Sequence, residues 1–242
     1  MYLINPQTGL ILTCLRLYGI LSLAMCEKYT VKKMKKIFFY GLFVVIGISF
    51  SIVVSAEGDA EKGKSLFQVC AACHGQNGEG NKALNAPANA GQNEWYVVRQ
   101  LKNFRAGIRG ADPKDIFGAQ MRPMALTLPD EQAVKDVAAY IVTLAAPNPP
   151  KTIEGNIEAG KKAYTPCVAC HGENGEGNKS LNAPKLSNQH DWYIVRQMQI
   201  FKSGVRGTHA KDIYGAQMRA MAQMLTTDEQ INDVAAYLAT LN

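Results

Sequence analysis

Residues 70–75 read Cys-Ala-Ala-Cys-His-Gly, and residues 167–172 read Cys-Val-Ala-Cys-His-Gly. Each stretch places two thiols one helical turn apart on the same side, with a histidine directly after them. At this spacing two cysteines reach the two vinyl groups of one porphyrin, while the imidazole points toward its iron. We therefore predict two covalently bound haem c groups. Their thioether bonds would come from Cys70, Cys73, Cys167 and Cys170, and their iron ligands would include His74 and His171.

Other chemistries use the same cysteine spacing. A redox-active dithiol would need a strand–helix–strand context, which this sequence does not show. The four cysteines could instead form one zinc site with four thiolate ligands, but the duplicated histidines and methionines would then have no role. Both are weaker interpretations than haem attachment. Cys14 and Cys26, the other two cysteines, lie far upstream of the motifs.

The two motifs belong to an internal duplication. An offset of 97 residues maps Cys70 onto Cys167 and Met121 onto Met218. The segments 118–122 and 215–219 both read Gly-Ala-Gln-Met-Arg. A unit of this length in two copies is typical of a small domain rather than of a solenoid repeat. Such a small domain buries little surface by itself, and a covalently bound haem would complete its core.

Helical periodicity dominates both copies, and no stretch alternates as a strand does. The sequence therefore predicts an all-α fold. We expect one helix to lead into each cysteine pair, and a last helix to begin near Thr127–Asp130 in the first copy and at Thr226 in the second. We place the first domain at residues 57–146 and the second at 153–242. A stiff Pro-rich linker at 147–152 joins them.

A second iron ligand must come from later in each copy, and methionine is the candidate. Met121 and Met218 occupy equivalent positions, in loops that we expect just before the last helix. Met124, Met221 and Met224 follow within a few residues, and methionine is also a common core filler, so spacing alone leaves the choice of ligand open. Met198 has no counterpart in the first copy, which favours a role in core packing.

Several other polar and aromatic residues are candidates for haem contacts. Three duplicated basic positions either neutralise haem propionates or are solvated on helix surfaces, and the sequence favours neither. They are Arg99, Arg105 and Arg109, with Arg196, Lys202 and Arg206 in the second copy. Trp95 and Trp192 either donate an indole N–H to a propionate or pack in a core.

Two histidines lie outside the motifs. His190 aligns with Asn93, and His209 aligns with Asp112. Because neither histidine repeats, we expect both at the surface rather than at a metal.

The formal net charge of +6 originates in the N-terminal segment. Residues 1–56 contain six Lys or Arg and one acidic residue, Glu27, whereas 20 basic and 19 acidic residues follow from Glu57 onward. Haem propionates would make this part slightly acidic. We therefore expect no nucleic-acid partner.

Residues 34–56 have the three parts of a secretory signal: Met-Lys-Lys, the apolar run 37–54, and Val-Ser-Ala. We expect cleavage after Ala56 and export to the periplasm. An uncleaved membrane anchor at 37–54 is the alternative, because 18 residues approach the length of a membrane span. A signal peptide begins at the initiator, so we interpret residues 1–33 as a gene-model extension or a disordered leader.

The order of these features resembles the class I cytochromes c, and the duplication resembles the dihaem cytochrome c4 family. The resemblance spans essentially all of residues 57–242. It rests on the two Cys-x-x-Cys-His-Gly motifs, on Pro184-Lys185-Leu186 and on Gln100-Leu101. In that family the axial methionine stands seven residues before a leucine that precedes the last helix. Met121 and Met218 satisfy this count, so the resemblance favours them as ligands.

The resemblance also implies how the groups are arranged. A proline carbonyl, here that of Pro87 or Pro184, would accept the second N–H of each axial histidine. The two haems would lie edge to edge across the domain interface, with their propionates facing.

Iron with His and Met ligands has no open coordination position and takes a relatively high potential from the methionine. These properties favour electron transfer. The resemblance implies a carrier that accepts electrons from a membrane-bound or periplasmic donor and passes them to a terminal oxidase or another reductase. A dihaem peroxidase is one alternative, although no additional histidine is shared by the copies as a gated ligand. A haem-based sensor is another.

Overall fold

The computed structural model describes residues 57–241, and the predictions made above for residues 1–56 lie outside that range. Within it the chain is helical and contains no β-strand, only two isolated bridges. The prediction of an all-α fold is confirmed. The first half contains α2 (Ala60–His74), the 3-10 helix η1 (Lys82–Leu84), α3 (Glu94–Arg105), α4 (Ile116–Leu126) and α5 (Glu131–Ile141). The second half contains α6 (Ile157–His171), α7 (Asp191–Lys202), α8 (Ile213–Ala222) and α9 (Asp228–Leu238).

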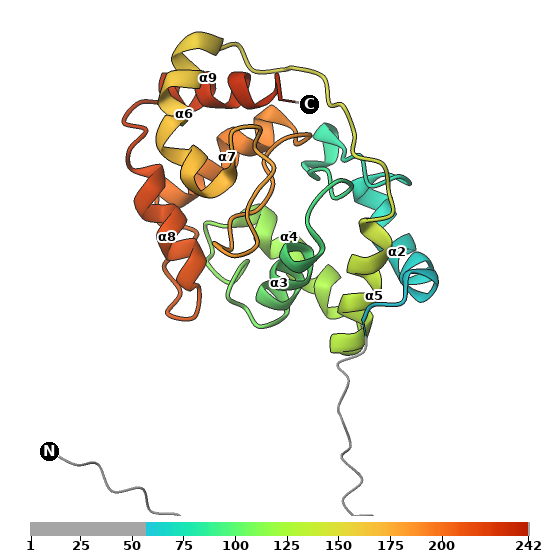
Figure 1. Ribbon diagram of the computed structural model, residues 1–242. Coiled ribbons are helices and arrows are strands. Elements are labelled where there is room, and N and C mark those ends of the chain that lie inside the picture. Colours follow the sequence, from blue (N-terminus) through green and yellow to red (C-terminus); the bar gives the residue numbers. More distant parts are fainter. Residues whose placement is uncertain (1–56, 242) are drawn as a thin grey trace, which may run out of the picture. The chain divides into compact units, whose positions relative to one another are not determined.

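The first and last helices of each half pack closely together, α2 on α5 and α6 on α9 (Figure 1). A glycine makes this approach possible: a Cβ at Gly63 would lie 1.9 Å from the backbone oxygen of Asp136. Gly160 has the same relation to Asp233. The buried carboxylate of Asp136 also accepts a hydrogen bond from the backbone N–H of Asp59, at 2.8 Å. The start of α2 is therefore fixed to α5.

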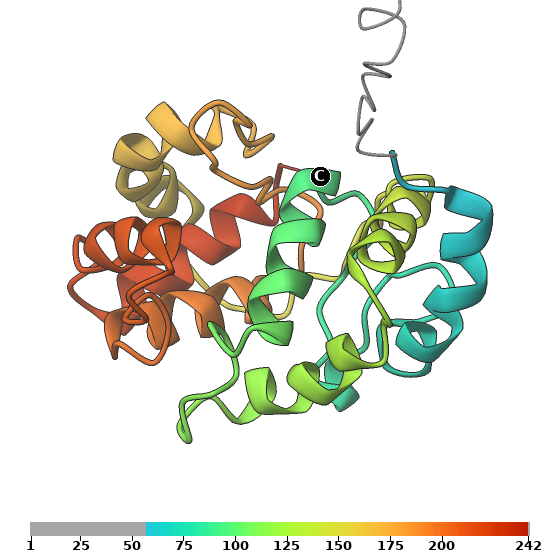
Figure 2. The same ribbon diagram turned by 90° about the horizontal axis from the view of Figure 1, so that it is seen from below.

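Each half has its own hydrophobic core. In the first, Phe67, Val134 and Val137 are fully buried, and α3 contributes Leu101 and Phe104. In the second, the core centres on residues from α6, α7 and α9, namely Tyr164, Ile194, Ile231, Val234 and Ala235. Met198 packs against this second core, as expected from its lack of a counterpart. The two halves lie side by side, with α3 and α7 toward the space between them (Figures 1 and 2).

The last helix of each half begins with a side-chain cap. In α5 the carboxylate of Asp130 accepts from the N–H of Ala133, within the expected region. In α9 the cap is Thr227, which accepts from the N–H of Gln230. The prediction of Thr226 was therefore wrong by one residue. Gln230 explains the shift, because its side-chain oxygen accepts from the N–H and the hydroxyl of Thr226 and so holds that residue just before the cap.

Residues 145–156 have no regular secondary structure. The end of this connection is attached to the second half by Asp191, which is 2% exposed. Its carboxylate accepts from the hydroxyl of Thr152 at 2.7 Å and from the N–H of Ile153 at 2.8 Å. The equivalent position in the first half, Glu94, is exposed. Asp191 therefore stabilises the end of the connection between the halves, a segment that is attached at this position only in the second half.

Among residues 57–241, no helix is both long enough and apolar enough to span a bilayer.

Candidate functional site

The two Cys-x-x-Cys-His motifs face one continuous cavity of about 320 Å³, which both halves line. Each motif ends its helix, α2 or α6, so its histidine stands at the helix C-terminus. The lining includes every cysteine, histidine and methionine that the sequence predicted for haem binding. They are Cys70, Cys73, His74 and Met121 from the first half, with Cys167, Cys170, His171 and Met218 from the second.

Both motif histidines are buried and held in one orientation. Nδ1 of His74 lies 2.8 Å from the carbonyl oxygen of Pro87, and Nδ1 of His171 lies 2.8 Å from that of Pro184. Burial lowers the pKa of both histidines by more than the proline carbonyl raises it. A neutral imidazole that donates from Nδ1 keeps the lone pair of Nε2 for a metal. The geometry is therefore that of a histidine prepared to ligate iron.

The motif cysteines are not a reactive dithiol. Cys70 and Cys167 are half-buried, Cys73 and Cys170 are exposed, and none of the four forms a disulfide. Burial raises the pKa of Cys70 to about 11 and also raises that of Cys167, whereas a catalytic thiolate needs a lowered pKa. Within the described residues no three His, Cys, Asp or Glu side chains are grouped to hold a metal ion. This arrangement does not fit the zinc alternative.

Met121 lies in α4 and Met218 in α8, so the expectation that they occupy loops was wrong. A side-chain cap starts each helix: Asp115 accepts from the N–H of Gly118 at 2.9 Å, and Asp212 accepts from that of Gly215 at 3.0 Å. The cap offsets the low helix propensity of the glycine that follows it.

The alternative methionines line the cavity as well. Met124 and Met221 face it from one turn further along the same helices. Met221 is 38% exposed, whereas Met121 packs against the first core.

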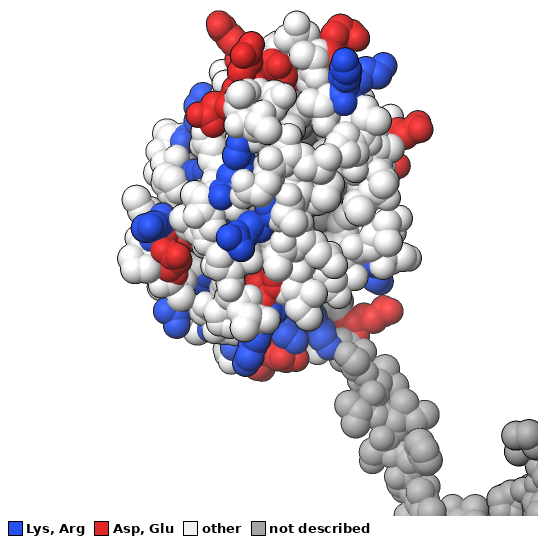
Figure 3. Space-filling model, turned by 90° about the vertical axis from the view of Figure 1, so that its left-hand side faces the viewer, with Lys and Arg blue, Asp and Glu red and all other residues white. Residues whose placement is uncertain are grey.

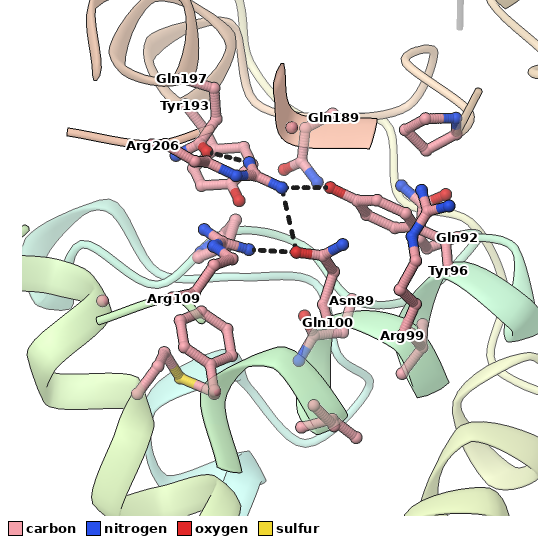
Figure 4. A pocket seen from close by; sticks show the side chains of 18 of the residues that line it. Asn89, Gln92, Tyr96, Arg99, Gln100, Arg109, Gln189, Tyr193, Gln197 and Arg206 are labelled. Carbon is pink, nitrogen blue, oxygen red and sulfur yellow. Dashed lines mark hydrogen bonds between the residues drawn. The ribbon is translucent and has the colours of Figure 1, made fainter. Parts of the chain in front are cut away.

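Two arginines lie buried between the halves, Arg109 and Arg206, each 7% exposed (Figure 4). Arg206 donates to the side-chain oxygens of Gln197 at 2.5 Å and Gln100 at 3.0 Å, and Arg109 donates to Gln100 at 2.7 Å. Nε of each arginine is buried without a hydrogen-bond partner. In the part of the chain that the structure describes, neither guanidinium forms an ion pair with a carboxylate.

This arrangement fits the prosthetic group that the motifs imply. Burial and the neighbouring Arg206 lower the pKa of Arg109, since two like charges share this cavity. The buried carboxylates of Asp115 and Asp212 also line it, but within residues 57–241 neither forms an ion pair with these guanidinium groups. Buried charges are stable only when an opposite charge or hydrogen bonds compensate them. Haem propionates are anions, and Arg109 and Arg206 would bind them. The indole nitrogen of Trp192 is also buried without a hydrogen-bond partner, but Trp192 is not among the residues that line the cavity.

The other basic positions have different roles. Arg99 crosses to the second half, where it donates to the carbonyl of Asn182 at 2.9 Å and stacks on Tyr214. Arg196 crosses in the opposite direction, to the carbonyl of Asn85 at 2.8 Å and the ring of Phe117. Arg105 and Lys202 do not line the cavity and instead donate to the backbone carbonyls of Leu128 and Leu225. The sequence alone did not distinguish the roles of these three pairs of equivalent basic residues.

His190 is not at the surface, and that expectation was wrong. It is 7% exposed, and its Nε2 donates to the carbonyl of Glu79 in the first half, at 2.9 Å. His209 is exposed, as expected. The sequence analysis also missed Gln92 and Gln189, which make hydrogen bonds across the halves. Their equivalence at the offset of 97 residues was the available signal.

Comparison with known proteins identifies the class of protein. The family profile described as Cytochrome c matches twice, over residues 60–145 and 157–242. The described fold and the two duplicated motifs thus correspond to two tandem cytochrome c domains, which bind two covalent haem c groups.

The similar proteins are more specific. Cytochrome c4 of Azotobacter vinelandii is 31% identical over 83% of this chain and 97% of its own length. The crystal structure of reduced recombinant cytochrome c4 from Pseudomonas stutzeri shares 28% identity, covers 75% of this chain and 98% of its own, and superimposes with a TM-score of 0.58. A thiosulfate dehydrogenase electron acceptor of Stutzerimonas stutzeri is 28% identical over 79% of this chain and 91% of its own length. The chain belongs to the cytochrome c4 family. It is a dihaem electron-transfer protein, not a peroxidase.

Proposed function

We propose that this protein is a periplasmic electron carrier with two His/Met-ligated haems, and that it connects a respiratory donor to a terminal oxidase or reductase. The thioether bonds would form at Cys70, Cys73, Cys167 and Cys170. The axial ligands would be His74 and Met121 in the first half and His171 and Met218 in the second. Iron held in this way supplies one-electron chemistry without an open coordination position.

The observation that carries this proposal is the repeated placement of complementary ligands on one cavity. In each half a buried histidine, fixed at Nδ1 by a proline carbonyl, and a methionine from α4 or α8 line the same space. Arg109 and Arg206 then provide cations at the side of the cavity where the halves meet. The chain's own residues thus exclude water, orient the histidines and compensate propionate charge.

The test of the ligands is the near-infrared absorption of the oxidised protein, which contains one Met-to-iron charge-transfer band per ligated haem. We expect two equivalents in the parent protein and one in Met121→Ala or Met218→Ala. Met124→Ala and Met221→Ala are the matched controls, because each removes a methionine that lines the same cavity. Loss of a band in the control variants, with retention in the first pair, would contradict the assignment.

Partners are proposed to bind transiently at the mouth of the cavity. Exposed apolar side chains line it in both halves, and small, partly apolar contacts suit brief redox encounters. They are Val69, Leu84, Leu181 and Met221. On the face shown in Figure 3, basic and acidic side chains both occur among large uncharged areas. The similarity to a thiosulfate dehydrogenase electron acceptor supports a thiosulfate dehydrogenase as one donor to test.

Export is proposed to use residues 34–56 as a signal peptide, with an uncleaved anchor at 37–54 as the alternative. Intact-mass measurement of the mature protein tests this proposal. A mass equal to that of a chain beginning at Glu57 plus two haems supports cleavage. The mass of a chain that begins upstream of Glu57 overturns it.

A further inference from the structure

The peptide unit between Pro87 and Ala88 connects the two halves at the first histidine. Its carbonyl oxygen, on Pro87, lies 2.8 Å from Nδ1 of His74. Its N–H, on Ala88, donates to the side-chain oxygen of Gln189 at 3.0 Å. Gln189 belongs to the second half, so a side chain of one half binds the peptide that orients the histidine of the other.

The same arrangement, in which a peptide unit bound to a motif histidine is also bound by a side chain of the other half, occurs in the opposite direction. We call this arrangement a relay. The carbonyl of Pro184 lies 2.8 Å from Nδ1 of His171, and the N–H of that peptide unit, on Lys185, donates to the side-chain oxygen of Asn93 at 2.9 Å. Asn93 belongs to the first half. Each histidine is therefore the start of a chain of two hydrogen bonds that ends on the other half.

Hydrogen bonds in such a chain polarise one another. When the peptide N–H donates, more negative charge accumulates on its carbonyl oxygen, which becomes a stronger acceptor for Nδ1–H. A more strongly bound Nδ1–H makes the imidazole a better electron donor to a metal on Nε2. Oxidised iron gains more from this donation than reduced iron does, because it carries the larger positive charge.

We propose that Gln189 and Asn93 are positioning residues that act across the interface. Gln189 lowers the reduction potential of the haem in the first half, and Asn93 lowers that of the haem in the second. This inference rests on the axial role proposed above for His74 and His171.

The two relays differ in strength. Gln189 binds Ala88 twice, because its amide N–H also donates to the carbonyl of that residue at 2.9 Å. In the other direction two side chains make the equivalent contacts. Asn93 accepts from the N–H of Lys185, and Gln92 donates to the carbonyl of Lys185 at 3.0 Å. Gln92 and Gln189 approach the interface from opposite halves (Figure 4). Ala88 is 4% exposed, whereas Lys185 is half-buried, so water replaces a lost partner less readily at Ala88. Gln189 therefore has the larger effect.

The experiment uses the full-length holoprotein and the variants Gln189→Leu and Asn93→Leu. The potential of each haem is followed separately by NMR through its axial methionine methyl signal during a redox titration. Gln189→Leu is expected to raise the potential of the first-half haem by a threefold change in its redox equilibrium, about 28 mV at 59 mV per tenfold for one electron. The second-half haem should keep its potential. Asn93→Leu should raise only the second-half potential, by less.

A second readout separates the relay from simple loosening of the interface. In the reduced protein the Nδ1–H resonance of His74 should move upfield in Gln189→Leu, because its hydrogen bond weakens. Gln92→Leu is the matched control: it removes a contact between the halves at the carbonyl of Lys185 but leaves the N–H of that residue bound to Asn93. It should move the His171 resonance less than Asn93→Leu does.

Two outcomes overturn the inference: unchanged potentials in both variants, or a shift in the haem of the half that carries the substitution. Failure of the proposed ligation is distinguished by the near-infrared spectrum of the parent protein. Absence of the Met-to-iron bands there contradicts the ligand assignment itself. Bands that persist in the parent and the variants, with unmoved potentials, contradict only the relay.

Discussion

At the scale of single residues, the two halves have different side chains at the buried aromatic position that precedes each Cys-x-x-Cys-His motif. The first half has Phe67 there, and the second has Tyr164, which is 1% exposed. The hydroxyl of Tyr164 donates to the carbonyl of Gly172 at 2.9 Å, directly after the motif histidine. The second half thus adds a partly buried hydrogen bond at a core position that both halves share.

Tyr164→Phe should destabilise the protein by about 0.5–1.5 kcal/mol, the usual contribution of one buried hydrogen bond. Denaturant unfolding of the holoprotein measures this change. Phe67→Tyr is the reciprocal variant and should cost little, because it places a hydroxyl at the equivalent of Tyr164. Equal stability of Tyr164→Phe and the parent would show that this hydrogen bond contributes nothing.

The buried arginines give a second prediction at this scale. Arg109→Gln removes a positive charge from a site that excludes water, and a nearby cation favours the reduced, less positive haem. The reduction potential should therefore fall, by an energy on the order of 1 kcal/mol for a charge interaction at an effective dielectric of about 20. Arg105→Gln is the control, because Arg105 donates to a backbone carbonyl and does not line the cavity. Spectroelectrochemical titration measures the reduction potentials of both variants. An unchanged potential in Arg109→Gln would contradict the proposed pairing of Arg109 with a propionate.

Residues whose role is determined within one half were easier to predict from the sequence than residues whose role depends on contacts with the other half. The motif cysteines and histidines were predictable because their spacing within one helix determines which way they face. His190 and Gln189 were not, since they acquire partners only when residues about 100 positions apart meet. The choice of Met121 and Met218 as ligands stays a prediction. The helices that contain them were not predicted, because propensity alone does not reveal the caps at Asp115 and Asp212.

At the scale of secondary-structure elements, close backbone contact between α2 and α5 depends on Gly63. Gly63→Ala should cost about 1–3 kcal/mol, because the added methyl group meets the carbonyl of Asp136 and overpacks the helix pair. Lys64→Ala, at the exposed next position, is the control. Thermal unfolding of the holoproteins compares them. A Gly63→Ala protein as stable as the control would mean that the two helices can separate at little cost.

The connection into α6 gives a pH-dependent prediction. Burial raises the pKa of Asp191, but hydrogen bonds from Thr152, Ile153 and Trp192 outweigh it and hold the pKa below its ordinary value of 3.8. A carboxylate whose folded pKa is lowered stabilises the protein above the unfolded pKa, and this contribution is lost as pH falls through the folded pKa.

Asp191→Asn should therefore destabilise the protein at neutral pH, by about 1–3 kcal/mol, and the difference from the parent should shrink below about pH 4. Unfolding measured from pH 3 to 7 tests this expectation. Glu94→Gln, at the equivalent exposed position of the first half, should show no such dependence. A difference that stays constant across this range would exclude the carboxylate charge as the cause.

At the scale of the whole molecule, Arg99 and Arg196 attach each half to a loop of the other. Arg196→Ala should increase amide hydrogen exchange in residues 81–86, which Arg196 contacts at Asn85, and Arg99→Ala should do so in residues 178–183. Loss of a cation–π contact and two hydrogen bonds predicts a local change of roughly 1–2 kcal/mol. Arg122→Ala, an exposed control, should alter neither loop. Faster exchange confined to the substituted half would contradict the crossed arrangement.

Gly80 has a backbone φ of +89°, and a side chain there would place its Cβ 2.6 Å from Nε2 of His190. The histidine of the second half thus contacts a position of the first half that has no room for a side chain. At the position equivalent to His190 the first half has Asn93, which accepts a different hydrogen bond, from the N–H of Lys185, so the two halves are not interchangeable modules. A tandem built from two copies of residues 57–146 would lose this histidine contact, because both copies would have an asparagine in its place.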